Sequence, residues 1–579
     1  MLETTLSTEF VPGTNLSGSL ASADWRYLLP SQELESVLCF GIPSTPALLV
    51  LSKIGEKVFI VSNDRDAFQK VEKNCRDKNV GNIQTIGIEK FTNLPFEEQT
   101  IDLIYLAGLR GGIKFFRESV VRSEINRLLK PAGVLYFEIA GWGDRLGSRK
   151  SLNEFLQQGF QIRGRFWLTH FSGELRTALP LNDDEAAGYF FSNVIYGQSF
   201  KKRTLSKAGR LMSKTGMISN VAPRHAVLLQ RSSGSEPSSN GKLIDLPDYL
   251  RAIAAKSGID VSNYTYGLSA RGKYNTNKVI FFLFGKTSRE VEVVIKMTRS
   301  PEFNRRLENE YHILTRLSEG DYVDKTTFPA PLFFDYHNGL AAIAIKAIHG
   351  KPFRTQTMAT PDCPLAKDAI NWITRLGTAS ANHQAASAAE VAEALRRLFN
   401  SFKRIYPLTA DEEKFLSDQI DAIAESKERF PLVFQHGDPG TWNMMVSDET
   451  NRIIVIDWES GEPEGMPLWD LFYFFRTYAS WVSRQQGNRD SIKYFSENFL
   501  TKTELQSVLV NITERYRAGV KLDRELIRPL FYTCWMHRAL KESTRLTEAS
   551  LQQGHYFKVL RMCIAQQDNP ALKALFQED

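Results

Sequence analysis

The chain has 579 residues, of which 42% are hydrophobic and 24% are charged, and its formal net charge is +6. These proportions are typical of a soluble globular protein with several buried cores. The positive excess is too small to indicate nucleic-acid binding, so no nucleic acid is expected as a partner. At roughly 100–200 residues per domain, the length predicts three or four structural units.

The cysteines are odd in number and have no spacing typical of a metal site: Cys39, Cys75, Cys363, Cys534 and Cys563. A disulfide framework or a zinc site is therefore not expected, and a reducing compartment is indicated. The first residues, MLETTLSTEFVPG, lack the basic and apolar regions of a signal peptide. No apolar run approaches the ~20 residues of a membrane-spanning helix. We therefore expect a cytoplasmic protein without a transmembrane segment.

Strand-like and helix-like segments alternate in the region before position 231. Apolar runs predict strands at 36–41, 57–62, 101–108 and 131–141. Helical patterns occupy residues 44–55, 65–78 and 116–130. Apolar strands separated by helices indicate a parallel sheet covered on both faces. An α/β domain with a Rossmann-like parallel sheet is therefore predicted for residues 1–230.

The stretch RSSGSEPSSNGK, residues 231–242, has the composition of a flexible linker. After it, residues 278–285 and 290–297 look like neighbouring antiparallel strands, followed by a helix at 300–319 and a strand at 340–350. Most of the remaining sequence has a helical pattern. This order predicts an α+β region with a small sheet lobe over residues 243–350 and a larger helical lobe over residues 351–579, the layout of a bilobal kinase.

The helical region contains the stretch QHGDPGTWNMMV, residues 435–446, which is followed by IIVIDWES. Glycines and a proline place Asp438 in a loop, and Asn443 precedes a short strand. A turn at 447–452 and a returning strand at 453–456 would bring Asn443 and Asp457 to the same end of a hairpin. Phosphoryl transfer needs a carboxylate near the attacking hydroxyl and oxygen ligands for Mg²⁺. Asp438, Asn443 and Asp457 are residues of these types.

The motifs HGDPGTWNMMV, VIDWES and PLWDLFYF resemble the aminoglycoside phosphotransferase and choline kinase branch of the protein-kinase-like superfamily, over about residues 259–560. The resemblance implies that Asp438 is the catalytic base, that Asn443 and Asp457 hold Mg²⁺, and that Asp470 supports the catalytic loop. For His436, we expect a packed histidine that supports the loop rather than a proton carrier.

The same resemblance implies an ATP site upstream. Lys296, in the strand VVIKM, would contact the nucleotide phosphates and pair with Glu310 of the next helix, with Glu308 as the alternative. A phosphate-covering hairpin is expected at 266–282. It contains Gly272 but no G-x-G-x-x-G motif, so the choice between ATP and GTP stays open.

The first region resembles a class I S-adenosylmethionine-dependent methyltransferase over about residues 30–230, from VLCFGIPSTPALLVLSKIGEKVFIVSND to EINRLLKPAGVLYFEIAG. The resemblance implies a cofactor loop at Gly41 and a ribose-binding side chain, usually a carboxylate, for which Asn63 or Asp64 are the candidates. Cys39 stands where an acidic residue is usual. Both a working methyltransferase that binds S-adenosylmethionine and a structural or substrate-presenting domain stay open.

Together these features predict an ATP-dependent phosphotransferase fused to a methyltransferase-like domain. The acceptor would be a hydroxyl of a small molecule or glycan, in polysaccharide or secondary-metabolite modification. It would lie against the helical region after residue 470, including residues 534–544. The alternative is a pseudoenzyme scaffold that binds ligands or partners without turnover. A protein kinase is disfavoured because no arginine precedes Asp438.

Overall fold

The structure, a computed structural model, describes residues 20–106, 118–140, 152–171, 174–181, 183–194, 200–215, 218, 222, 224–231, 244–272, 274–288, 290–426, 430–487 and 490–578. The predicted linker therefore lies outside the described residues, apart from Arg231. The chain forms two compact units. The sheet unit comprises Gly18–Asn304 and Phe333–Ala347, and the helical unit includes Arg305–Leu332 and Ile348–Asp579.

Five parallel strands form one part of the sheet unit: β1 (Leu34–Phe40), β2 (Gly55–Ser62), β3 (Ile83–Gly87), β4 (Ile101–Leu106) and β5 (Leu129–Ala140). Their order, β3-β2-β1-β4-β5, is that of a doubly wound sheet. The helices α2 (Thr45–Ile54), α3 (Arg65–Asp77) and α5 (Ser119–Leu128) follow β1, β2 and β4. The predicted Rossmann-like parallel sheet is confirmed.

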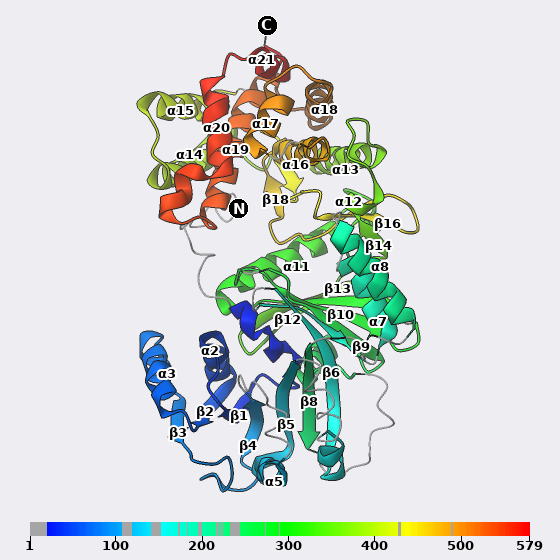
Figure 1. The fold of residues 1–579 in the computed structure, drawn as a ribbon. Coiled ribbons are helices and arrows are strands. Elements are labelled where there is room, and N and C mark those ends of the chain that lie inside the picture. Colours follow the sequence, from blue (N-terminus) through cyan, green and yellow to red (C-terminus); the bar gives the residue numbers. More distant parts are fainter. Residues whose placement is uncertain are drawn as a thin grey trace. The chain divides into compact units, whose positions relative to one another are not determined.

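Both faces of these strands are buried. Val37 and Cys39 of β1 belong to one apolar core with Leu51 of α2, whereas Leu38 belongs to a second core with Ile125 of α5. Successive strand residues point to opposite faces, so a strand covered on both sides needs a continuous apolar run. Figure 1 shows α2 and α3 beside β1, β2 and β3.

The sheet continues through antiparallel strands to a total of 13 among the described residues, in the order β12-β13-β11-β10-β9-β7-β6-β8-β5-β4-β1-β2-β3. The added strands are β6 (Phe160–Phe171), β7 (Glu174–Pro180), β8 (Arg224–Arg231), β9 (Tyr264–Ser269), β10 (Val279–Gly285), β11 (Val291–Met297), β12 (Pro331–His337) and β13 (Leu340–Lys346). The predicted antiparallel pairing of 278–285 with 290–297 is confirmed as β10 with β11.

One pairing joins strands from the two sides of the predicted linker. In β7 and β9, Thr177 lies opposite Ser269, and Ala178 lies opposite Leu268. Strands before and after residues 231–242 therefore share one sheet and one compact unit. The division into domains at 1–230, 243–350 and 351–579 stays a prediction.

Further helices of the sheet unit are η1 (Leu20–Leu28), α7 (Asp184–Tyr189), η2 (Phe190–Val194), α8 (Phe200–Lys214), α10 (Asp248–Lys256) and η3 (Pro301–Phe303), among others. Of these, η1 and η3 are 3₁₀ helices and η2 is a π-helical turn. Tyr27 of η1 and Leu250 of α10 belong to the same buried core as Val37 of β1.

The helical unit contains two small sheets. Strands β14 (Gly350–Pro352), β16 (Met444–Ser447) and β17 (Ile453–Val455) form one, and β15 (Val433–Gln435) and β18 (Glu462–Gly465) form the other. The first helix of the unit is α11 (Asn304–Glu319). The unit also contains the 3₁₀ segments η4 (Lys325–Thr327), η5 (Arg524–Leu526) and η6 (Glu548–Gln553).

Most of this unit is helical, as predicted. The helices are α12 (Phe353–Gln356), α13 (Pro364–Ser380), α14 (Ala388–Ile405), α15 (Ala410–Ala424), α16 (Trp469–Gln485), α17 (Ser491–Phe499), α18 (Glu504–Val520), α19 (Ile527–Ser543), α20 (His555–Ala565) and α21 (Pro570–Phe576). Helices α16 and α19 are buried on nearly every side. Among the described helices, none has the length and apolar character needed to cross a membrane.

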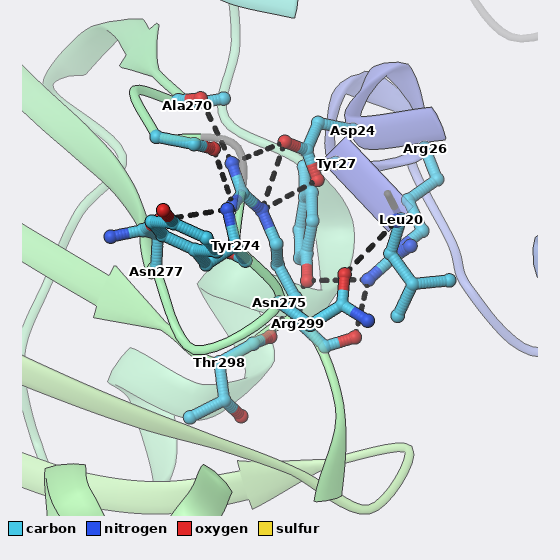
Figure 2. Close-up of polar contacts among 11 residues, drawn as sticks. Leu20, Asp24, Arg26, Tyr27, Ala270, Tyr274, Asn275, Asn277, Thr298 and Arg299 are labelled. Atoms are coloured by element: carbon cyan, nitrogen blue, oxygen red, sulfur yellow. Dashed lines mark hydrogen bonds and ion pairs between the residues drawn. The ribbon is translucent and has the colours of Figure 1, made fainter. Parts of the chain in front are cut away.

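A buried ion pair fastens η1 to the end of β11 in the sheet unit. The Arg299 guanidinium contacts the Asp24 carboxylate through Nη2 at 2.7 Å and through Nε at 3.0 Å, and neither side chain is exposed to solvent. Beside it, Arg26 donates to the Arg299 carbonyl and Tyr27 donates to the Thr298 carbonyl, each at 2.7 Å. Figure 2 shows Asp24 at the Arg299 guanidinium, with Arg26 and Tyr27 beside it.

We predict that Asp24→Asn lowers the free energy of unfolding of the full chain by about 3 kcal/mol or more, because Arg299 keeps a buried charge without a counterion. Urea denaturation measures the change. Glu35→Gln is the matched control, since it breaks an ion pair whose carboxylate side chain is 75% exposed. Exposed pairs of this kind contribute about 1 kcal/mol at most. Equal losses in the two variants would contradict the prediction.

Candidate active site

The first residues of the loop between β15 and β16 are hydrogen-bonded to the carboxylate of Asp470, which lies in the first turn of α16. The backbone N–H of His436 donates to Oδ2 of Asp470 at 2.6 Å, and that of Gly437 donates to Oδ1 at 3.0 Å. Burial raises the pKa of Asp470, while the Arg538 charge and the two backbone N–H groups act in the opposite direction. Each carboxylate oxygen thus fixes one peptide of the loop, which is the kind of support that the sequence resemblance implies.

Gly437 allows the loop to follow this path. Its φ is +77°, in the left-handed region that favours glycine. A Cβ atom at this position would overlap the carbonyl oxygen of Ser460. The close approach of the two backbones therefore requires glycine at position 437.

His436 is fully buried, and both of its ring nitrogens have partners. Nε2 lies 3.0 Å from the carbonyl oxygen of Ile456, and Nδ1 lies 3.1 Å from the backbone N–H of Asp438. A carbonyl only accepts and an amide N–H only donates, so Nε2 carries the proton and Nδ1 accepts. The ring also packs on Trp458, with centroids 4.5 Å apart. This arrangement makes His436 a packed, hydrogen-bonded support for the loop.

Asn443 holds Asp438 from the other end of the loop. Its Nδ2 donates to the Asp438 backbone oxygen at 2.9 Å and to Oδ2 of the Asp438 carboxylate at 3.1 Å. These donations orient the amide, so Oδ1 of Asn443 is turned to the opposite side. The Asp438 side chain is 35% exposed, which leaves the carboxylate accessible to a substrate.

The predicted hairpin is present and places Asn443 and Asp457 at the same end. Met444 of β16 lies opposite Val455 of β17, and the N–H of Ile456 donates to the Asn443 carbonyl at 2.9 Å. Asp457 has φ of +73°, a conformation that costs a non-glycine residue on the order of 1 kcal/mol. The surrounding contacts must therefore hold this aspartate in place.

The donor set at this end of the hairpin suits Mg²⁺. Asn443 supplies an amide oxygen and Asp457 a carboxylate, and Mg²⁺ is commonly bound by one or two such protein oxygens while it keeps several waters. Among the described residues, no three His, Cys, Asp or Glu side chains form a cluster that could hold a metal ion.

Lys296 and Glu310 belong to different compact units. Lys296 lies on β11 in the sheet unit, opposite Ile280 and Ile343, and is 6% exposed. Glu310 lies on α11 in the helical unit, is fully buried, and accepts from the backbone N–H of Trp458 at 3.3 Å. This contact connects α11 to the residue after Asp457. The pairing of Lys296 with Glu310 stays a prediction.

The three other predicted cofactor residues lie in the sheet unit. Gly272, in the loop between β9 and β10, has φ of +104°, and a Cβ atom there would overlap the side chain of Asn277. Gly41 follows β1 with φ of +84° and donates its N–H to the Val61 carbonyl at 2.9 Å. Asp64 is exposed and caps α3, accepting from the backbone N–H of Ala67 at 3.1 Å. Ribose binding by Asp64 stays a prediction.

Arg538 and Lys541 of α19 are two further cations at the catalytic loop. The Arg538 Nη1 lies 3.6 Å from Oδ1 of Asp438, and its guanidinium carbon lies 3.3 Å from the centre of the Tyr473 ring. Lys541 donates to the Gly437 carbonyl at 3.4 Å. The sequence pointed to residues 534–544 but not to these two, whose three-residue spacing on one helical face was the available signal.

Glu462 adds a carboxyl group to this cluster. Burial raises its pKa to about 7, and the Asp470 charge acts in the same direction, while Lys541 and Arg538 oppose them. Burial likewise lowers the pKa of Lys541, and the Arg538 charge adds to the effect. The ionisable groups beside the catalytic loop therefore shift one another's pKa.

The loop, the hairpin and the supporting aspartate lie in a stretch that matches a known family. Residues 275–498 match the phosphotransferase enzyme family, APH. The match covers less than half of the chain, so it gives a family likeness for this stretch alone and leaves the region 1–230 outside it. A search of curated proteins finds no match.

Solved structures give similarities for both regions. An aminoglycoside phosphotransferase from Streptomyces rimosus is 17% identical, with a TM-score of 0.31 and coverage of 52% of this chain and 99% of its own. A Plasmodium vivax ethanolamine kinase is 13% identical, with a TM-score of 0.33 and coverage of 55% and 87%. The N-methyltransferase NodS from Bradyrhizobium japonicum is 12% identical, with a TM-score of 0.22 and coverage of 34% and 87%. The phosphotransferase and the methyltransferase resemblances are thus both found among solved structures. The identities and TM-scores are too low to indicate a substrate.

We predict that Glu462 makes stability depend on pH. Its folded-state pKa of about 7 lies above the ordinary value of 4.5, so the folded state binds the proton more tightly than the unfolded state. The resulting stabilisation is fully present below about pH 4.5 and is lost as pH rises through about 7. Compared with Glu462→Gln, wild type should lose more thermal stability between about pH 5 and pH 8. Parallel melting temperatures for the two proteins across this range would contradict the assignment.

Proposed function

We propose that the phosphotransferase domain transfers the γ-phosphoryl group of ATP to a hydroxyl of a small molecule or glycan. The observation that carries the proposal is the Asp438 carboxylate, which is accessible to solvent yet held by the Asn443 amide at 3.1 Å. Phosphoryl transfer depends mainly on positioning and on compensation of phosphate charge, so a fixed carboxylate beside magnesium-type ligands fits this reaction.

Asp438 would orient the acceptor hydroxyl and take its proton as the phosphoryl group is transferred. Asn443 and Asp457 would hold Mg²⁺, which when bound compensates negative charge on the nucleotide phosphates. Lys296 is proposed to contact those phosphates, with Glu310 as its carboxylate partner. His436 and Asp470 position the loop through the backbone of residues 436–438.

For the region 1–230 we propose a methyltransferase-like fold with a candidate S-adenosylmethionine site at Gly41. The alternative is a structural or substrate-presenting domain, and Asp64 favours it, because its carboxylate caps α3. A role of the two regions in polysaccharide or secondary-metabolite modification, in the cytoplasm, completes the proposal. Titration of the full chain with S-adenosylmethionine separates the cofactor site from the structural alternative. Only a working cofactor site binds S-adenosylmethionine, and Gly41→Val should then abolish that binding.

We predict that the full chain binds ATP–Mg²⁺ in a calorimetric titration and that Asp457→Ala weakens this binding at least tenfold. Asp438→Asn should retain ATP–Mg²⁺ binding but lower phosphoryl transfer by about 10²–10⁴-fold, the usual contribution of a general base. Transfer is measured with radiolabelled ATP over a panel of sugars, amino alcohols and glycans, and ATP hydrolysis is followed in parallel.

The matched control is Asp448→Asn, a change in the exposed turn between β16 and β17 that leaves the loop and the hairpin ends intact. It should leave both binding and transfer unchanged. A wild-type chain that binds no ATP–Mg²⁺ would overturn the phosphotransferase proposal and favour the scaffold alternative. The same holds if Asp457→Ala binds as tightly as wild type.

A further inference from the structure

The loop between β9 and β10 is the predicted phosphate-covering segment, and it lacks the G-x-G-x-x-G motif. Glycines usually let such a loop bring its backbone close to phosphate. Here Gly272 has a positive φ, and the side chain of Asn277 occupies the space beside it. The Asn277 side chain also accepts from the backbone N–H of Tyr274 at 3.1 Å. Something other than a glycine motif must therefore shape the rest of the loop.

The loop is wrapped around the guanidinium of Arg299. Nη1 donates to the carbonyls of Gly272 and Tyr274, each at 2.8 Å, and Nη2 donates to the carbonyl of Ala270 at 2.9 Å. The remaining N–H groups bind Asp24, so all five guanidinium donors have partners. Three carbonyls of one short loop thus converge on a single buried cation, as Figure 2 shows for Ala270 and Tyr274.

This convergence decides the direction of the N–H groups as well. A trans peptide places the carbonyl and the following N–H on opposite sides of the chain. Since the carbonyls of Ala270 and Tyr274 point to Arg299, the N–H groups of Arg271 and Asn275 point away from it. Backbone N–H groups that point out of a turn are the groups with which proteins bind phosphate.

The guanidinium is in turn positioned by η1. Asp24 compensates the guanidinium charge, and both side chains are fully buried. Helix η1 also contacts the loop directly. The backbone N–H of Leu20, at the start of η1, donates to the side chain of Asn275 at 3.0 Å. Segment 20–28 therefore supports the loop in two ways, directly through Asn275 and indirectly through Arg299. The segment and the loop lie far apart in sequence.

We propose that Asp24 and Arg299 are positioning residues for the nucleotide: they shape the loop between β9 and β10 so that its backbone binds the phosphates of ATP. The inference rests on the proposed phosphotransferase function. It makes Asp24, which lies before the methyltransferase-like strands, a structural requirement of the nucleotide site. A guanidinium with three carbonyl contacts replaces the glycine motif of related loops.

The test compares ATP–Mg²⁺ binding with loop order in the full chain. Arg299→Lys keeps the positive charge but cannot reach three carbonyls and Asp24 together, because an ammonium has only three donors. We expect the Kd for ATP–Mg²⁺ to rise at least tenfold, together with faster hydrogen exchange in residues 270–278. Asn275→Ala, which removes the contact with Leu20, should raise the Kd a few-fold while the melting temperature changes little.

Tyr27→Phe is the matched control. It removes a buried hydrogen bond between η1 and the carbonyl of Thr298, next to Arg299, and leaves the contacts of the loop carbonyls intact. Its melting temperature should fall, whereas its Kd for ATP–Mg²⁺ should stay within twofold of wild type. A purely structural role would instead make the Kd follow the melting temperature in all three variants.

The outcomes separate the two proposals. If wild type binds no ATP–Mg²⁺, the proposed function fails and this inference fails with it. If wild type binds but folded Arg299→Lys and Asn275→Ala bind equally well despite faster exchange in the loop, the positioning role alone is overturned. Weaker binding in both variants, with the control unchanged, supports it.

Discussion

Irregular loops have no ladder of hydrogen bonds, so their buried backbone groups must find partners elsewhere, and unsatisfied groups cost about 1–3 kcal/mol each. In the helical unit, Asp470 accepts from two successive N–H groups at the start of the catalytic loop. In the sheet unit, Arg299 donates to three carbonyls of the loop between β9 and β10. Charge-assisted bonds are roughly twice as strong as neutral ones, so each buried ion fixes the loop around it.

The parts that could be predicted from sequence are those whose signals are local. Asp438, Asn443 and Asp457 belong to one short continuous stretch, and one turn between two short apolar strands brings the last two together. The strands of the doubly wound sheet could be predicted for a similar reason, because a strand buried on both faces is apolar throughout. In these places, residues that are close in sequence are also close in the structure.

Contacts between distant segments could not be predicted in this way. Nothing in the sequence near Asp24 indicates a partner as far along the chain as Arg299, and an aspartate in a short helical segment is usually exposed. The pairing of β7 with β9 likewise depends on the register of two strand edges, which composition does not reveal. Arg538 reaches Asp438 only because α19 packs beside the catalytic loop, so its role is decided by tertiary packing.

Charge balance around the catalytic loop follows from the same packing. Arg538 and Lys541 bring two cations next to a loop that contains Asp438 and rests on Asp470. Two carboxyl groups already face these two cations, so a third anion has no counterion of its own. Glu462 is that third carboxyl group, and its pKa of about 7 means that it ionises only near neutral pH. Its proton therefore changes the net charge of the groups that pack beside the catalytic loop.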